Sequence, residues 1–177
     1  MSLGDGEIPF IKVYNLTKTG ALDFTNKPTF ITGETHKRLL ARSRVLPGDV
    51  LMNIVGPPLG KVSIVPNDFP EWNTNQAVVL FRPSSAILTK YLALCLLAEP
   101  VLGWITRTAQ ATVGQSNITV SNSRLIPLPL PPLQEQQRIV AQVDHLLALC
   151  YDLETQLASS EKEGRNLLGA TLTRALN

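Results

Sequence analysis

The side chains that most often carry catalysis or bind metals are few in this sequence, and they are not spaced for either role. It has two histidines, His36 and His145, and two cysteines, Cys95 and Cys150. These residues lack the close Cys/His spacing of a zinc site, so we expect no metal site. His36 stands beside Lys37–Arg38 and is expected at the surface, and His145 at the rim of a helix. Both cysteines are expected to be small core residues in a reducing compartment.

The sequence also has neither a phosphate-binding P-loop nor the motif of an adenine methyltransferase. Gly56, Gly60 and Lys61 lack the spacing and the following hydroxyl residue of a P-loop. The segment GPPL at 56–59 is not the Asn/Asp-Pro-Pro-aromatic motif of adenine methyltransferases. Asp49, in Pro-Gly-Asp, is most simply a turn residue, although it could instead orient a hairpin. The sequence therefore predicts no catalytic residues and no cofactor, and a protein that is not an enzyme.

Composition and charge are those of a soluble chain with enough apolar residues for a hydrophobic core. Of its 177 residues, 44% are hydrophobic, and it has no apolar run of 18 residues that could span a membrane. Its first ten residues do not resemble a secretory signal, so we expect a cytoplasmic protein. Residues 1–132 carry 12 Lys/Arg and 8 Asp/Glu, whereas residues 133–177 carry 4 and 6. A mildly basic domain followed by an acidic helix is compatible with nucleic-acid binding, although many unrelated domains share that charge.

The stretch from Leu133 to Leu157 has the strongest secondary-structure pattern in the chain. Its apolar residues follow one another at steps of four and three, which is the a/d seam of a coiled coil. Pro131 and Pro132 precede it, and proline suits the start of a helix. The partner of this seam could be the chain's own domain, a later helix or another chain. The residues predicted to serve dimerisation and docking are Ile139, Val143, Leu146, Cys150, Leu153 and Leu157.

Residues 4–132 are predicted to form a mixed α/β domain of the α+β class, and residues 133–177 a helical dimerisation and spacer region. Runs of β-branched and aromatic residues between turn signals predict strands at Ile8–Leu16, Pro28–Thr32, Val50–Val55, Lys61–Val65 and Gln76–Phe81. Helices are expected at Thr35–Leu40 with Thr35 as cap, at Ser84–Ala98, at Val101–Ile105, and as one turn within Thr119–Leu125. Thr106–Asn117 is expected to be a surface loop and Ile126–Leu130 an extended segment. Gly164 leaves open whether the last helix is continuous or broken.

Three consecutive motifs precede and begin the predicted long helix. They are a loop with Gly, Thr, Gln and Asn, a proline-punctuated extended segment, and a helix start of the form PPL-x-EQ-x-x-IV. In this sequence they are Gln110–Asn122 (QATVGQSNITVSN), Ile126–Pro132 (IPLPLPP) and Leu133–Val140 (LQEQQRIV). Together they resemble the specificity subunit of type I restriction-modification systems. Further segments that resemble the family are Gly6–Ile11, Pro47–Leu51 with Gly60–Val62, and Asn75–Gln76 with Arg82–Pro83. The resemblance spans roughly residues 6–176.

This resemblance implies a module that reads double-stranded DNA and leaves catalysis to partner subunits. Family members dock methyltransferase subunits through their helices, and through these the restriction subunit. They carry two recognition domains, each reading half of a split target, where this sequence has one, so we expect a half-subunit that forms a homodimer. The helices act as a ruler between the half-sites. The 25 residues of Leu133–Leu157 would extend about 37 Å as a helix, close to the roughly 34–36 Å between half-sites one DNA turn apart.

The resemblance also directs attention to side chains that can contact DNA. Base edges are read by amides, hydroxyls and cations, and phosphates are bound by Arg and Lys. The residues expected to contact DNA are Lys12, Lys18, Lys61, Asn73, Thr74, Asn75, Arg107, Gln110, Thr112, Gln115, Ser116 and Asn117. Lys27, Arg42 and Arg44 are further candidates for phosphate contacts.

A second class of function fits part of the sequence. Pro127–Pro132 resembles a polyproline ligand, and the heptads resemble a dimerising helix. The chain would then be a protein-interaction adaptor with no DNA role. Leucines alternate with these prolines and favour a buried strand instead. Salt-dependent DNA binding distinguishes the two functions, because phosphate contacts release counterions.

Overall fold

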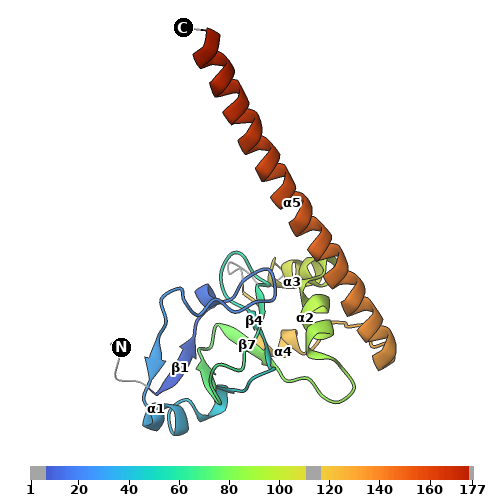
Figure 1. Ribbon diagram of the computed structural model, residues 1–177. Helices are drawn as coiled ribbons and strands as arrows, with labels where there is room; N and C mark the ends of the chain where they lie inside the picture. Colours follow the sequence, from blue (N-terminus) through green and yellow to red (C-terminus); the bar gives the residue numbers. More distant parts are fainter. Residues whose placement is uncertain (1–6, 111–116, 176–177) are drawn as a thin grey trace. The chain divides into compact units, whose positions relative to one another are not determined.

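The computed structural model describes residues 7–110 and 117–175 (Figure 1). The chain divides into two compact units, residues 1–137 and residues 138–177, called here the N-terminal unit and the helical unit. The predicted division lay after residue 132. The compact N-terminal unit extends slightly further because Gln136, in the first turn of the long helix, is buried within it.

Two small sheets build the N-terminal unit. The first has the strand order β2-β1-β6-β3, formed by Phe30–Ile31, Ile8–Ile11, Trp72–Thr74 and Arg44–Val45. Strands β1 and β6 are parallel, with Phe10 opposite Asn73, and the other pairs are antiparallel. The second sheet has the antiparallel order β5-β4-β7, formed by Val62–Ile64, Val50–Asn53 and Val78–Phe81. Two short 3-10 helices, Val13–Asn15 and Ala41–Ser43, follow β1 and precede β3.

Strand β4 is buried on both faces, which explains its unbroken apolar sequence. Side chains alternate along a strand, and here Val50 and Met52 join a core cluster with residues of α2 (Thr89–Leu97) and α3 (Glu99–Gln110). Leu51 joins a second cluster around Trp72. The strand therefore lies between two hydrophobic cores, and it pairs with β5 and β7 at its edges.

Much of the predicted α+β architecture is confirmed. The hairpin of β4 and β5, the strand β7 and the extended piece β2 all lie within their predicted ranges. The predicted helical turn is α4 (Val120–Ser123), and the hydroxyl of its cap Thr119 accepts a hydrogen bond from the Asn122 amide at 3.0 Å. Local patterns sufficed here because each segment has a strong apolar run or cap between clear turn residues.

Other element bounds were wrong. Helix α1 (Gly33–Lys37) begins earlier than expected, because the Thr32 hydroxyl, and not Thr35, caps it by accepting from the Thr35 amide at 3.2 Å. Strand β1 ends at Ile11, and α2 begins at Thr89 instead of Ser84. The proline segment before α5 contains no strand, and Leu130 is 60% exposed there.

Helix α5 (Leu133–Ala175) is one continuous helix of 43 residues and passes through Gly164 without a break. Nothing lies within 4 Å of the position where a Cβ would stand on Gly164, so this residue serves no close packing among the described residues. Cys150 is exposed on α5, contrary to the expected core position, whereas Cys95 in α2 is half-buried. Among the described residues, no single helix is long and apolar enough to cross a membrane. Helices α2 and α3 meet the length and composition only when they are taken together, and the chain bends by 59° between them.

Gly60, at the end of the loop between β4 and β5, has a backbone that other residues rarely adopt. Its φ is +76°, and an added Cβ would stand 2.4 Å from Cδ2 of Leu102. Gly56 in the same loop has a φ of +82° but no atom within 4 Å of that position. The close approach of α3 to the hairpin therefore depends on Gly60 in particular.

Replacing Gly60 with alanine is expected to lower the free energy of unfolding by about 2–3 kcal/mol, because backbone strain and the clash with Leu102 add. Gly56→Ala is the matched control and introduces only the backbone strain, about 1–2 kcal/mol. Urea unfolding of both variants measures the two values. Equal losses would contradict the assigned close approach of α3.

Candidate nucleic-acid interface

A buried polar network joins α1 to strand β6. The His36 side chain is fully buried, and its Nδ1 lies 2.9 Å from Nδ2 of Asn73. Its Nε2 lies 3.1 Å from Oε2 of Glu71. Because an amide nitrogen can only donate, Nδ1 accepts from Asn73 and Nε2–H donates to Glu71. The expectation that His36 lies at the surface is therefore wrong, and the residue is a structural link between two elements.

The same network reaches the surface through Arg44. The other carboxylate oxygen of Glu71 accepts from the Arg44 guanidinium. This contact, together with the His36 hydrogen bond, lowers the pKa of the Glu71 carboxyl, although desolvation opposes the shift. Oδ1 of Asn73 accepts from the Ser43 hydroxyl at 2.8 Å, and Nδ2 of Asn73 also donates to the Leu40 carbonyl at 3.1 Å. The segment that carries residues 40–44 is thus fixed to β6.

Beside this network lies a pocket of about 340 Å³ with two arginines and two amide side chains on its wall. Parallel pairing of β1 with β6 brings Phe10 to the pocket next to the end of β6. We call it the arginine–amide pocket and define it by Arg42, Ser43, Arg44, Thr74, Asn75 and Gln76. Apolar residues, among them Phe10 and Leu80, complete its lining. It combines the side-chain types that bind phosphates with those that read base edges.

The polar side chains of this pocket differ in their exposure and in the contacts that they already make within the protein. Gln76 and Arg42 are exposed, and Arg42 makes no ion pair among the described residues. Oδ1 of Asn75 accepts from the Ala77 amide at 3.2 Å, which turns the chain from β6 toward β7. Lys12 follows β1, and its ammonium lies 6.0 Å from the centre of the Phe10 ring. Among the described residues, the lining of this pocket thus has two cations and no carboxylate, and Glu71 pairs with Arg44 from outside the lining.

Two of the predicted DNA contacts are part of the scaffold. Asn73 and Thr74 lie in β6, a strand that was not among those predicted, and are almost completely buried. Thr74 donates its hydroxyl proton to the Ile11 carbonyl at 3.1 Å. The mostly polar sequence EWNTN at 71–75 lacks the run of apolar or alternating residues that predicts a strand. Its tertiary hydrogen bonds satisfy the side chains that would otherwise favour a loop.

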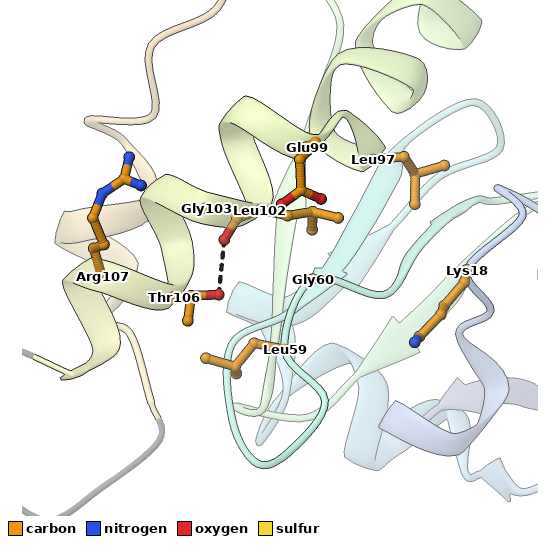
Figure 2. Close-up of a pocket in the computed structure, with 9 residues that line it drawn as sticks. All are labelled: Lys18, Leu59, Gly60, Leu97, Glu99, Leu102, Gly103, Thr106 and Arg107. Carbon is orange, nitrogen blue, oxygen red and sulfur yellow. Dashed lines mark hydrogen bonds between the residues drawn. The ribbon is translucent and has the colours of Figure 1, made fainter.

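Lys18 and Arg107 lie at a second pocket, of about 570 Å³, formed by the β4–β5 loop and α3. Figure 2 shows the two cations at opposite ends of this pocket, with Gly60 between them. Arg107 was expected in a loop, but α3 extends to Gln110 and carries it. Val101, Ile105 and Ala109 are buried at steps of four, and this spacing was the signal for the longer helix.

The remaining predicted contacts are dispersed or lie outside the described residues. Asn117 holds the tip of the β4–β5 loop, because its Oδ1 accepts from the Gly56 amide at 3.0 Å. The Lys61 backbone amide donates to Asn53 in that hairpin at 2.7 Å, and its side chain is half-buried. Gln110 ends α3, and nothing is described of its side chain. Thr112, Gln115 and Ser116 lie outside the described residues.

Asp49 lies in the turn that was predicted for it. It also makes an ion pair with Arg82, which the turn pattern does not indicate. Its carboxylate accepts from the Leu46 amide at 2.7 Å and from two nitrogens of Arg82 at 2.8 and 2.7 Å. This partner raises the pKa of the Arg82 guanidinium. The pair joins the turn before β4 to the end of β7, so Asp49 orients the second sheet.

The proline-rich segment is held by the fold through its carbonyl groups. The hydroxyl of Tyr91 donates to the Pro129 carbonyl at 3.2 Å, and burial raises the pKa of Tyr91 to about 12, so the donor stays protonated. Leu128 packs against the larger core cluster, and the Pro131 carbonyl accepts from Gln136 at 2.9 Å. These contacts argue against a free polyproline ligand.

No group of three metal-binding side chains gathers anywhere in the described part of the chain. Arg42, Arg44, Asn75 and Gln76 bring side-chain types that can contact phosphates and base edges to the lining of one pocket. A family model described as the type I restriction modification DNA specificity domain matches residues 3–160. The chain therefore belongs to this family of DNA specificity domains.

Curated relatives are longer than this chain. It is 28% identical over 135 residues to the type I restriction enzyme EcoBI specificity subunit of Escherichia coli, a match that covers 76% of this chain and 28% of that protein. It is 35% identical over 101 residues to the type I restriction enzyme EcoAI specificity subunit of Escherichia coli, a match that covers 54% of this chain and 17% of that protein. The matched region thus spans less than a third of either relative.

Solved structures share the fold. The HsdS subunit from Thermoanaerobacter tengcongensis superposes with a TM-score of 0.72 at 21% identity, covering 92% of this chain and 42% of that one. A second chain, from work on complex assembly and conformational transition of the type I R-M system, superposes with a TM-score of 0.71 at 20% identity. This match covers 95% of the present chain and 43% of the other one. These similarities establish the architecture of a mixed α/β domain with a long C-terminal helix.

Proposed function

We propose that this chain reads one half of a bipartite DNA target through the arginine–amide pocket, and that α5 joins it to a second copy and to methyltransferase subunits. The observation that carries the proposal is the clustering of Arg42, Arg44, Asn75 and Gln76 on one surface of a DNA-specificity domain. Phosphate contacts by the arginines would fix the position of the domain on the duplex. The amides would then select bases, because asparagine and glutamine pair with adenine in the major groove.

The rigid network beneath the pocket supports this assignment. Glu71 binds Arg44 and His36 at once, and Asn73 binds His36, Ser43 and the Leu40 carbonyl. Recognition is more precise when side chains that contact the ligand are fixed by a second layer of hydrogen bonds. Glu71 also limits the net positive charge of the surface, and this should restrict binding to arbitrary DNA. Lys18 and Arg107 remain predicted phosphate contacts at the second pocket, and Lys61 remains one in the loop between β4 and β5.

The exposed seam of α5 supports self-association. In the single chain, Leu146 is 50% exposed and Leu153 and Leu157 are each 63% exposed. An apolar a/d seam of this length is stable only when a partner helix covers it. A second copy of α5 offers the same seam, and two recognition domains on one dimer would read two half-sites. The methyltransferase subunits would dock on the remaining helix surface, as the family resemblance implies.

Replacing Gln76 with alanine is expected to weaken binding to the cognate half-site by about 1–3 kcal/mol, or about 5- to 150-fold, because one base contact is lost. Binding to unrelated DNA should stay within about twofold, because Gln76 is uncharged. Gln134→Ala, an exposed glutamine in the first turn of α5, is the matched control. Fluorescence anisotropy with cognate and scrambled duplexes measures both affinities. An equal loss on both duplexes would contradict a base-reading role.

A further inference from the structure

The side chain of Gln136, in the first turn of α5, is fully buried in the N-terminal unit. A glutamine is rarely buried unless its amide is hydrogen-bonded. Here Oε1 accepts from the Leu88 amide at 2.9 Å, and Nε2 donates to the carbonyls of Ala86 and Pro131, each at 2.9 Å. Both donors and one acceptor site are thus used. One side chain thereby binds the loop before α2 and the segment that leads into α5.

These contacts connect the start of the helix to the body of the N-terminal unit. The backbone amides of Glu135 and Gln136 both donate to the Pro132 carbonyl, which starts the helix at that point. The Tyr91 hydroxyl holds Pro129 a few residues earlier. The neighbouring Gln137, in contrast, is exposed. Of these two adjacent glutamines, only Gln136 is therefore placed to fix how the first turn of α5 sits on the N-terminal unit.

We propose that Gln136 is a positioning residue that fixes the start of α5 and thereby sets the spacing between the two half-sites that a dimer accepts. This inference rests on the proposed function, because it needs a split target. The reason is geometric. If α5 spans the distance between two recognition domains, a small rotation or shift in its first turn moves each domain along or around the duplex. Gln136 would act without touching DNA, and its loss would widen the range of spacers.

The test uses Gln136→Glu in the full chain, with Gln137→Glu as a control that places the same charge on the adjacent exposed residue. A carboxylate cannot donate to the Ala86 and Pro131 carbonyls, so both hydrogen bonds are lost. Binding is measured on a single half-site and on split sites whose spacer is native, one base pair shorter or one base pair longer. We expect half-site affinity within about twofold of the unmodified chain, and at least a fivefold loss of preference for the native spacer. Gln137→Glu should keep that preference.

A second measurement does not depend on DNA. Hydrogen exchange at the Leu88 amide should become at least tenfold faster in Gln136→Leu, because leucine has no oxygen to accept from that amide, and should be unchanged in Gln137→Leu. If Gln136→Glu does not fold, Gln136→Asn serves instead, because its shorter side chain keeps the amide and cannot span all three contacts. Unchanged spacer preference with intact half-site binding would overturn the inference. If the unmodified chain bound no split site at all, the proposed function itself would fail, and the exchange result would still report on the Gln136 contacts.

Discussion

Replacing Arg42 and Arg44 together with alanine is expected to reduce DNA affinity about 30- to 900-fold at 0.15 M salt. Each guanidinium would lose a charge-assisted contact to phosphate, worth about 1–2 kcal/mol. The slope of log affinity against log salt should also fall by about 2, since each phosphate contact contributes about 0.9. Fluorescence anisotropy of a labelled duplex, titrated at several salt concentrations, gives both the affinity and the slope.

The choice of these two arginines follows from their surroundings. Arg42 is exposed and makes no ion pair among the described residues, so DNA would be its main partner. Arg44 is already oriented by Glu71. Arg38→Ala is the matched control, because Arg38 is equally cationic and 77% exposed but pairs with Glu34 outside the pocket. A variant lacking Lys18 and Arg107 tests the other pocket. If that variant lost the affinity and the Arg42/Arg44 variant did not, the proposed interface would be misplaced.

Replacing Leu146 and Leu153 with aspartate is expected to abolish self-association at micromolar concentration. The two residues occupy equivalent seam positions, seven residues apart, and are half or more exposed in the single chain. A dimer would bury two carboxylates from each chain against leucines, and burial of an unpaired charge costs several kcal/mol. Sedimentation equilibrium should change from the dimer mass to the monomer mass.

A control variant with the same added charge distinguishes disruption of the seam from a general loss of helix stability. Ala148 and Thr155 are also seven residues apart, are exposed and lie opposite the seam. Aspartate at both positions introduces the same two charges into the same helix, so any general weakening of α5 is matched. We expect this variant to stay dimeric. A Leu146/Leu153 variant that kept the mass of the unmodified chain would refute dimerisation through this seam.

The elements that sequence patterns predicted correctly are those whose stabilising contacts are local or repeat along one face. The heptad spacing of α5 needs no tertiary information, and the hairpin of β4 and β5 has apolar runs on both sides of a Gly-Pro loop. Strand β6 has only Trp72 as a large apolar residue, and its pairing partner β1 lies about sixty residues earlier. No local pattern predicts such a strand, because its stability comes from long-range hydrogen bonds.

The candidate interface was only partly predictable for the same reason. Residue type directed attention to Asn75, Arg42 and Arg44, but their meeting at one pocket depends on the β1–β6 and β3–β6 pairings. His36 looked exposed because it precedes two cations. Its burial depends on Asn73 and Glu71, which are distant in the sequence. The heptad pattern also placed Gln136, the glutamine of the PPL-x-EQ motif, on the polar face of the helix, where it was expected to meet water. This expectation is wrong, because Gln136 is buried and hydrogen-bonded.

One measurement tests the central claim, that the chain reads half of a split DNA target. The full chain is combined with the methyltransferase subunit of its own system, S-adenosylmethionine and genomic DNA, and methylated adenines are mapped by sequencing. We predict methylation at one bipartite motif whose two halves are the same short sequence in inverted orientation, separated by a fixed spacer. Methylation without a split motif, or none above the level of the methyltransferase alone, would contradict the proposed function.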